Sequence, residues 1–288
     1  MKNKINLAIC AYKGSSVGLL NKLVIDERYV INKVITSFDK VNNSLEELCK
    51  LHNIDLILIK NKTELITLKL NCDILIVNSF PFKLPKTFFK QAKLYAINVH
   101  HSLLPKFKGK HPINWNIVSS SKFCGVSIHH LSEDFDSGRI ISQAAIPLPQ
   151  YISSKELSIK LINLSEDILL CTLEILSNFK EIRGMKANAN GGDWKRPRIP
   201  KDGLIDFNLT DKQIKIMVTE STESDHASYG NTERGRKIFF ESIVSNRTGL
   251  ILAKTDHSIL VKTKSGIINL KVSKQDLKIL KIGDIFTQ

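Results

Sequence analysis

The chain has 288 residues and a formal net charge of +14 at neutral pH. Its 42% apolar and 24% charged residues are a globular composition that excludes global disorder, and its length suits one large domain or two ordinary ones. The positive charge indicates either a lysine-rich surface or an anionic partner, such as a nucleic acid, a membrane surface, a nucleotide or a polyanionic cofactor.

Five widely spaced cysteines contain no CxxC pair, which argues against a disulfide framework and against a structural zinc site. The apolar run at 5–10 is too short for a secretion signal, and no run of about 18 apolar residues could span a membrane. We therefore expect a cytoplasmic protein that does not bind membranes.

Apolar runs alternate with segments of helical periodicity through the first half of the chain. The expected strands are 5–10, 29–37, 56–59, 73–77, 94–99, 125–131 and 139–146. Helices are expected at 17–26, at 44–51 with Ser44 as the N-cap, and at 154–179. This alternation predicts the α/β class, with a mostly parallel sheet covered on both faces.

The pattern changes after a Gly- and Asn-rich stretch and a basic, Pro-containing run at 187–201. A short helix at 210–219 is followed by short, regularly spaced strands at 237–244, 248–253, 258–263 and 266–272. Such strands are typical of a small β-barrel or sandwich. We predict a catalytic domain over 1–184, a linker over 185–204 and a C-terminal β-barrel-like domain over 205–288.

The segment after the fifth strand carries the clearest chemistry. Asn98 and His100 are two residues apart at a strand end, so both side chains leave the same face. An imidazole that takes a proton from an amine, beside an amide that hydrogen-bonds an oxyanion, suits acyl transfer. Pro105 and Gly109 are expected to turn the next loop back over the site. The loop at 132–138 offers three carboxylates, one of which could orient His100 and raise its pKa.

Several motifs follow in a fixed order: Asn98-Val-His100, Ser102-Leu-Leu-Pro105, Gly109, Pro112, Gly-Val-Ser-Ile-His at 125–129, Asp136-Ser-Gly138 and Gln143. Together they resemble the 10-formyltetrahydrofolate-dependent formyltransferase family, and most of all its sugar N-formyltransferases and methionyl-tRNA formyltransferase-like members. The resemblance implies a Rossmann-like formyltransferase domain followed by a barrel similar to an OB fold.

The resemblance also implies a role for each of three residues in a folate-dependent N-formyltransferase. Asn98 would bind the oxyanion of the tetrahedral intermediate, and His100 would act as the general base toward the amine. Asp136 would orient and tune His100 and help to pass a proton to the departing folate nitrogen.

The co-substrate 10-formyltetrahydrofolate would lie against the loop at 79–84 and against 131–136. The resemblance places its pterin near Phe80 and Leu84, with Leu131 and Asp134 on the other side. Phe80 and Phe82 also suit an apolar wall for an aromatic ring, although either could simply pack on the core. We expect no metal, because the His pairs at 100–101 and 129–130 lack Cys or Glu at ligand spacing.

Three amine acceptors compete, and we rank a nucleotide-linked amino sugar first. The run 110–115 resembles sugar N-formyltransferases, as does the segment 198–207. A nucleotide diphosphate needs basic groups, for which Lys108, Lys195, Arg196 and Arg198 are general candidates. The residues that we expect to bind this substrate are Lys13, Lys110, Pro112 and Trp115.

Methionyl-tRNA ranks second, since the charge and a barrel after a basic linker favour it. Against tRNA, 36–44 has no basic insertion, and 222–236 lacks the expected Pro-Trp-Pro type segment. Glycinamide ribonucleotide ranks third, because its enzymes are usually single domains. A different class, a nucleic-acid-binding protein with an inactive scaffold, is disfavoured by the intact Asn98, His100 and Asp136 set. Exposed C-terminal strands could mediate a homodimer.

Overall fold

The computed structural model describes residues 4–12, 16–40, 43–179, 181–187, 192–207, 209–221, 229–232, 237–239, 242–247, 251, 253–263, 267–282, 284 and 286–287. The chain divides into two compact units. The first comprises Met1–Gly109, Gly125–Ala145 and Leu161–Trp194, and the second comprises Lys110–Cys124, Ile146–Lys160 and Lys195–Gln288. The predicted domains at 1–184 and 205–288 and the linker between them stay a prediction.

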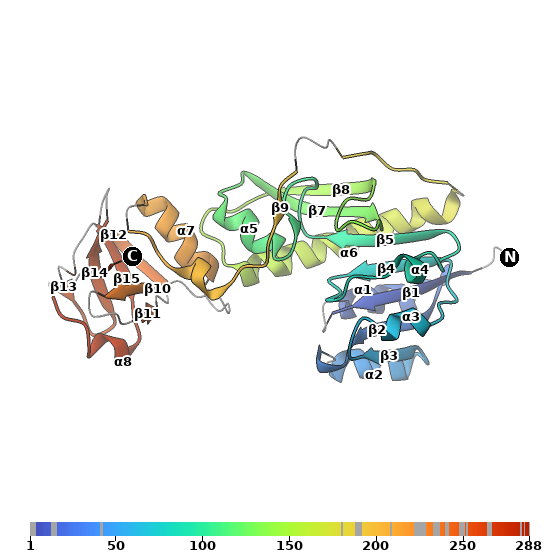
Figure 1. Ribbon diagram of the computed structural model, residues 1–288, viewed down its shortest axis with the longest axis horizontal. Helices are drawn as coiled ribbons and strands as arrows, with labels where there is room; N and C mark the ends of the chain where they lie inside the picture. Colours follow the sequence, from blue (N-terminus) through green and yellow to red (C-terminus); the bar gives the residue numbers. More distant parts are fainter. Residues whose placement is uncertain are drawn as a thin grey trace. The chain divides into compact units, whose positions relative to one another are not determined.

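A seven-stranded sheet forms the frame of the first unit, in the order β3-β2-β1-β4-β5-β7-β8 (Figure 1). Its strands are β1 Ile5–Ala11, β2 Tyr29–Ser37, β3 Asp55–Ile59, β4 Ile74–Asn78, β5 Tyr95–His100, β7 Phe123–His130 and β8 Ile140–Pro147. The first five are parallel, and β7 runs antiparallel to β5. The prediction of a mostly parallel sheet is confirmed.

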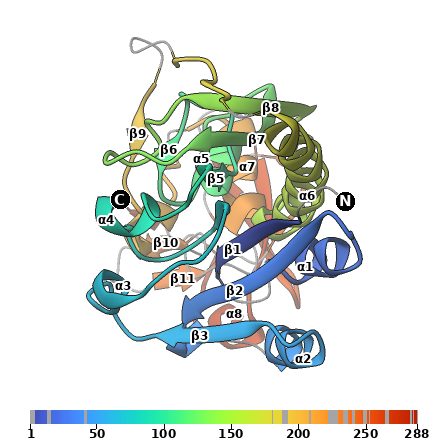
Figure 2. The same ribbon diagram turned by 90° about the vertical axis from the view of Figure 1, so that its right-hand side faces the viewer.

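Helices cover both faces of this sheet, as Figure 2 shows. On one face lie α1 Val17–Val24, α2 Asn43–Leu51 and α6 Ser154–Asn178, and on the other lie α3 Glu64–Thr67 and α4 Lys86–Phe89. The 3₁₀ turn η1, Phe38–Lys40, follows β2. Because α2 begins at Asn43, Ser44 is inside its first turn, and the predicted N-cap role of Ser44 is wrong.

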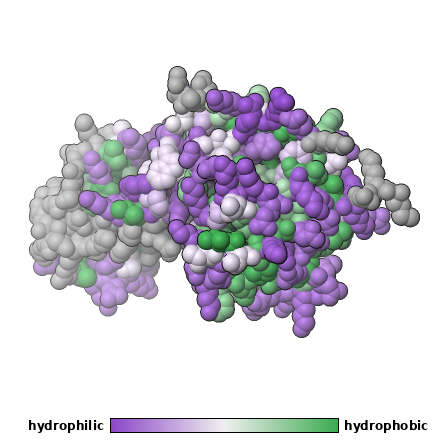
Figure 3. Space-filling model, turned by 45° about the vertical axis from the view of Figure 1, so that its right-hand side comes forward, coloured by the Kyte–Doolittle hydropathy of each residue, from purple (hydrophilic) through white to green (hydrophobic). Residues whose placement is uncertain are grey.

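The continuous apolar runs of the central strands explain why these strands lie inside. Residues 7–11 of β1 and 74–76 of β4 are at most 1% exposed, as expected for parallel strands that are buried on both faces. On the α3–α4 face, Leu75 and Val77 pack with Phe88. Hydrophilic residues predominate among the coloured atoms of the face in Figure 3, with smaller apolar patches between them.

The second unit contains α5 Pro112–Val118, the 3₁₀ turn η3 Pro200–Gly203, α7 Asp211–Ser221 and α8 Lys274–Leu277. Its short antiparallel strands form two sheets, ordered β11-β10-β16 and β12-β15-β14-β13. The bounds are β10 Tyr229–Thr232, β11 Lys237–Phe239, β12 Ser242–Arg247, β13 Ala253–Lys254, β14 Ser258–Lys262, β15 Ile267–Lys271 and β16 Phe286–Thr287. The predicted small β-structure is present, and its closure into an OB-like barrel stays a prediction.

Ile214 of α7 and Ile259 and Leu270 of the strands form one buried cluster in this unit. None of the helices in the described ranges combines the length and the hydrophobicity that a membrane crossing requires.

Candidate active site

The amide of Asn98 lies where β5 meets the antiparallel strand β7. The register pairs Asn98 with His129, and Nδ2 of Asn98 lies 3.0 Å from Nε2 of His129. Nδ1 of His129 lies 2.8 Å from the carbonyl oxygen of His130, which can only accept a hydrogen bond. Nδ1 therefore carries the proton, and Nε2 accepts from Asn98, which fixes the orientation of the amide.

His100 is buried, with 6% of its surface exposed. Its Nε2 donates to the carbonyl oxygen of Phe107 at 2.9 Å, so the neutral ring keeps its lone pair on Nδ1. That Nδ1 lies 3.6 Å from Oδ1 of Asp136. Burial lowers the pKa of His100, and the charge of Asp136 opposes this shift without cancelling it. His100 is therefore a neutral base at pH 7.

Asp136 reaches the same point from the loop between β7 and β8. Its Oδ2 accepts from the backbone N–H of Gly109 at 2.8 Å, and its Oδ1 accepts from Nδ2 of Asn98 at 3.3 Å. Burial raises the pKa of Asp136, but the surrounding groups, the His129 and His100 rings and the N–H of Gly109, together outweigh burial. The pKa of Asp136 is lowered overall, so its carboxylate stays ionised.

The backbone of this loop needs two unusual residues. Asp136 has φ 49°, a left-handed conformation that Asp tolerates better than most residues. Gly138 lies against β7 so closely that an added Cβ would be 1.7 Å from the carbonyl oxygen of His130. Only glycine permits this approach, which brings Asp136 back to the end of β5.

Hydrogen bonds hold the loop after β5 in place over His100. Ser127 donates to the carbonyl oxygen of Ser102 at 2.6 Å, and Nε2 of Gln143 donates to Oγ of Ser127 at 2.7 Å and to the carbonyl oxygen of Leu104 at 2.8 Å. On the far side, Oδ1 of Asp193 accepts from the N–H of Phe107 at 3.1 Å. This is the folded-back loop that Pro105 and Gly109 predicted.

Sequence reasoning gave no role to His129, Ser127 or Asp193. Ser127 and His129 are two residues apart on β7 within the Gly-Val-Ser-Ile-His motif, so their side chains leave the same face of the strand. This spacing was the one feature of the sequence that could have indicated their roles. Asp193 lies in the Gly- and Asn-rich stretch, where no pattern indicates a contact.

The residues expected to face folate form one apolar wall. The rings of Phe80 and Phe82 meet edge to face, with centroids 5.8 Å apart. Both pack with Leu131 against the buried cluster that contains Leu84. Such a wall suits the face of a flat aromatic ring. Asp134 is exposed, and its carbonyl oxygen accepts from Oγ of Ser132 at 2.7 Å.

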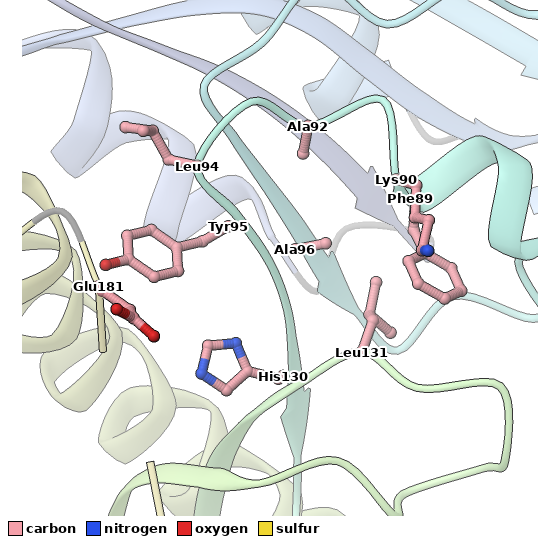
Figure 4. Close-up of a pocket in the computed structure, with 9 residues that line it drawn as sticks. All are labelled: Phe89, Lys90, Ala92, Leu94, Tyr95, Ala96, His130, Leu131 and Glu181. Atoms are coloured by element: carbon pink, nitrogen blue, oxygen red, sulfur yellow. The ribbon is translucent and has the colours of Figure 1, made fainter. Parts of the chain in front are cut away.

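A pocket of about 330 Å³ lies near the start of β5, beyond Leu131 (Figure 4). Its lining residues are Phe89, Lys90, Ala92, Leu94, Tyr95, Ala96, His130, Leu131 and Glu181. The Tyr95 hydroxyl donates to the carbonyl oxygen of Phe179 at 2.8 Å, and Nε2 of His130 donates to that of Ile182 at 2.8 Å. These hydrogen bonds attach the segment after α6 to the sheet, so the rings of Tyr95 and His130 have structural roles at this pocket.

Three of the four residues expected to bind the acceptor belong to the second unit. Nε1 of Trp115 donates to the carbonyl oxygen of Arg196 at 3.0 Å, and its ring centroid lies 5.2 Å from Nζ of Lys195 and 5.8 Å from the guanidinium carbon of Arg198. Pro112 is the first residue of α5, and Lys110 is exposed. Lys13 lies outside the described residues.

A buried ion pair holds Arg198 in place near the ring of Trp115. Arg198 donates to Glu220 at 2.7 Å, with side-chain exposures of 2% and 0%. Glu220 also accepts from Asn114 on α5. Burial raises the pKa of Glu220, and Arg198 and Asn114 oppose that shift. The motif at 112–115 therefore docks α5 onto α7 and presents Trp115 to the cations.

Within the described ranges, no group of three or more His, Cys, Asp or Glu side chains is arranged to hold a metal ion. The first unit offers an ionised carboxylate, that of Asp136, whose Oδ1 lies 3.3 Å from the oriented amide of Asn98 and 3.6 Å from Nδ1 of the neutral His100 ring. This set can move a proton and stabilise a developing oxyanion.

Comparisons with known proteins identify the family of the chain. A model of the family described as "Formyl transferase" matches residues 35–173. The methionyl-tRNA formyltransferase of Clostridioides difficile is 33% identical over 209 residues, which are 68% of this chain and 67% of that protein. That of Pediococcus pentosaceus is 28% identical over 214 residues, 73% of this chain and 66% of that protein. The chain thus spans about two thirds of the length of these relatives.

A solved structure extends the similarity to most of the chain. The N-formyltransferase from Helicobacter canadensis, in complex with folinic acid and dTDP-3-aminofucose, has a TM-score of 0.69 and 17% sequence identity. The match covers 93% of this chain and 99% of that one, which confirms the Rossmann-like formyltransferase fold. The chain belongs to the formyltransferase family.

Proposed function

We propose that this protein is an enzyme that transfers a formyl group from 10-formyltetrahydrofolate to the primary amine of a nucleotide-linked amino sugar. One observation carries the proposal. Oδ1 of Asp136 lies 3.3 Å from the amide nitrogen of Asn98 and 3.6 Å from Nδ1 of His100, so the three groups face one point.

Asn98 serves as the oxyanion donor in this proposal. One of its Nδ2 hydrogens stays with His129 at 3.0 Å, and the other makes the longer bond of 3.3 Å to Asp136. The second hydrogen is shared between Asp136 and the formyl oxygen as negative charge develops there. An oriented donor of this kind lowers the barrier because it is in place before the reaction starts.

His100 removes the proton of the attacking amine. Nδ1 is the receiving atom, because Nε2 is bonded to the carbonyl oxygen of Phe107. Asp136 stabilises the imidazolium that forms. The formyl carbon then leaves the folate nitrogen for the amine nitrogen, and one proton passes from the amine to the folate nitrogen, so atoms and charge balance.

The apolar wall supports a folate donor. Phe80, Phe82, Leu84 and Leu131 would contact its pterin, and Asp134 would lie beside it on the neighbouring loop. The wall belongs to the same unit as the three polar groups, and Leu131 lies on the loop between β7 and β8 that carries Asp136.

Two observations support the amino sugar as the acceptor. Helix α2 begins at Asn43, six positions after the end of β2 at Ser37, which leaves no room for a basic tRNA-binding insertion. Trp115 with Lys195 also combines an aromatic surface with a cation, which suits a nucleotide diphosphate. In this proposal Lys13, Lys110, Pro112 and Trp115 contact the nucleotide sugar.

Methionyl-tRNA is the second candidate acceptor. The two methionyl-tRNA formyltransferases described above are 28% and 33% identical over 73% and 68% of this chain, and its net charge is +14. Both observations fit an RNA partner, but neither identifies a surface that binds one.

Two substitutions test the proposed roles. We expect Asn98→Ala and His100→Ala each to lower the rate of formyl transfer on the order of 10²- to 10³-fold while the fold is retained. Release of tetrahydrofolate would be followed for each purified variant, with circular dichroism as the control for folding. Near-normal turnover in either folded variant contradicts the mechanism.

A further inference from the structure

Asp193 makes two hydrogen bonds to the loop that lies over His100. Its Oδ1 accepts from the backbone N–H of Phe107 at 3.1 Å, and its carbonyl oxygen accepts from the backbone N–H of Lys108 at 3.2 Å. All three residues belong to the first unit, although 86 positions separate Asp193 from Phe107 along the chain. Asp193 therefore fixes two consecutive backbone N–H groups of this loop.

One of the two peptide groups is also the hydrogen-bond partner of His100. The carbonyl group of Phe107 and the N–H of Lys108 belong to a single planar peptide unit, in which they point in opposite directions. The carbonyl oxygen accepts from Nε2 of His100 at 2.9 Å, and the N–H donates to Asp193. Hydrogen bonds at the two ends of one peptide polarise each other, so the contact with Asp193 strengthens the bond to His100.

The backbone of Phe107 needs support from outside the loop. Its φ of 55° lies in the left-handed region, which costs free energy for a residue with a large side chain. Such a conformation persists where the surrounding structure holds it in place. Gly192 adds to this support, because it lies so close to the loop that an added Cβ would be 2.7 Å from the carbonyl oxygen of Pro105. Gly192 and Asp193 together hold the loop from one side.

The position of the Phe107 carbonyl group determines which nitrogen of His100 carries the proton. A neutral imidazole has one N–H, and two acceptors compete for it. The Phe107 oxygen lies 2.9 Å from Nε2, and Oδ1 of Asp136 lies 3.6 Å from Nδ1. If the Phe107 oxygen moves away, the carboxylate favours the proton on Nδ1. Nδ1 then has no lone pair to receive a proton from the amine.

We propose that Asp193 is a positioning residue for formyl transfer, which keeps the lone pair of His100 on Nδ1 through the peptide between Phe107 and Lys108. The inference rests on the proposed function, in which Nδ1 is the atom that receives the proton. In this role Asp193 touches neither the substrates nor the reacting atoms. It acts on the rate of proton transfer and not on the binding of folate or amine.

Two substitutions of Asp193 separate this role from a general effect on the fold. Asp193→Ala removes the acceptor of the Phe107 N–H, so the loop and the His100 ring lose their exact position. We expect kcat to fall about 10- to 100-fold, with the KM of each substrate nearly unchanged. Asp193→Asn keeps an oxygen that accepts from the same N–H, so this variant should retain most of the rate.

Nitrogen NMR of the full chain with isotope-labelled histidine tests the proposal, because protonated and unprotonated ring nitrogens have well-separated chemical shifts. Loss of signals in His100→Gln assigns those of His100. Spectra and formyl-transfer kinetics would be compared for wild type, both Asp193 variants and the matched control Asp167→Ala. Asp167 is 73% exposed on α6 and pairs with Lys22 on the surface. Asp193 is exposed, so its variants should stay folded, which thermal unfolding checks.

We expect His100 to carry its proton on Nε2 in the wild type, in Asp193→Asn and in the control. In Asp193→Ala the proton should lie partly or wholly on Nδ1, and kcat should fall. An unchanged tautomer or an unchanged kcat in Asp193→Ala overturns the inference, as does an equal loss of rate in Asp193→Asn. If the wild type formylates no amine, the proposed function fails, while the tautomer comparison still decides the inference.

Discussion

Replacing Asp136 by Asn changes the charge of the site with almost no change in shape. The amide oxygen can still accept from the N–H of Gly109, which Oδ2 accepts at 2.8 Å in the wild type. The negative charge that stabilises the imidazolium of His100, once it forms, is lost. The variant therefore separates the electrostatic role of Asp136 from its part in holding the loop.

The distance between the two groups sets the magnitude. Unit charges 3.6 Å apart, as Nδ1 of His100 and Oδ1 of Asp136 are, attract by about 4–5 kcal/mol at an effective dielectric constant of about 20. This is the stabilisation that the imidazolium of His100 loses in the variant. Rearrangement recovers part of it, so we expect kcat to fall roughly 10²- to 10³-fold.

The pH dependence should shift as well. Burial lowers the pKa of His100 and Asp136 opposes it, so removing the carboxylate lowers this pKa further. Catalysis needs neutral His100 and declines as the pH falls through its pKa. The acid limb of the pH–rate profile should therefore move to lower pH in the variant.

The assay measures formylated product by mass spectrometry in single turnover across a pH series, for wild type, Asp136→Asn and the control Asp167→Asn. Asp167 is 73% exposed and pairs with Lys22 on the surface, so its loss should leave the rate unchanged. A folded Asp136→Asn variant with a wild-type rate and profile would refute the proposed role.

Three further predictions follow from the contacts. In Gly138→Ala the new Cβ would be 1.7 Å from the carbonyl oxygen of His130, so the loop that carries Asp136 must move by over about 1 Å. We expect turnover to be about 100-fold slower, and an unchanged rate would contradict this role of the loop. Burial lowers the pKa of His101 to about 4, so the unfolded chain takes up a proton at this residue before the folded chain does. The free energy of unfolding should therefore fall by about 2 kcal/mol from pH 7.5 to pH 5 because of His101. Urea unfolding should show a smaller fall over this pH range in His101→Gln. Glu220→Ala leaves Arg198 buried without its partner, so denaturant unfolding should show a loss of about 3–5 kcal/mol, and a loss below about 1 kcal/mol would argue against the pair's burial.

The first unit was predictable because its strands are unbroken apolar runs. The expected strand at 73–77 is β4 at Ile74–Asn78, and the expected helix at 154–179 is α6 at Ser154–Asn178. Ser44 failed as an N-cap because the helix already begins at Asn43. Asn42, Asn43 and Ser44 are all residue types that favour the N-cap, and local sequence does not decide among them.

The juxtaposition of Asn98, His100 and Asp136 was predictable from motif order and strand-end position. The part played by His129 was not, because it depends on the antiparallel register that pairs this residue with Asn98. The contact of Asp193 with Phe107 joins positions 86 residues apart, so it does not affect the hydrophobic periodicity of either segment. Long-range hydrogen bonds of this kind are set by tertiary packing and not by local pattern.

Formyl transfer with a panel of amines tests the central claim most directly. Purified protein and 10-formyltetrahydrofolate would be incubated with dTDP- and UDP-linked amino sugars or with charged initiator methionyl-tRNA, and tetrahydrofolate and formylated product would be measured. We predict that an amino-sugar nucleotide is formylated by the wild type and not by Asn98→Ala. Formylation of the tRNA alone would contradict the proposed acceptor, and no formylation of any amine would contradict the proposed enzyme activity.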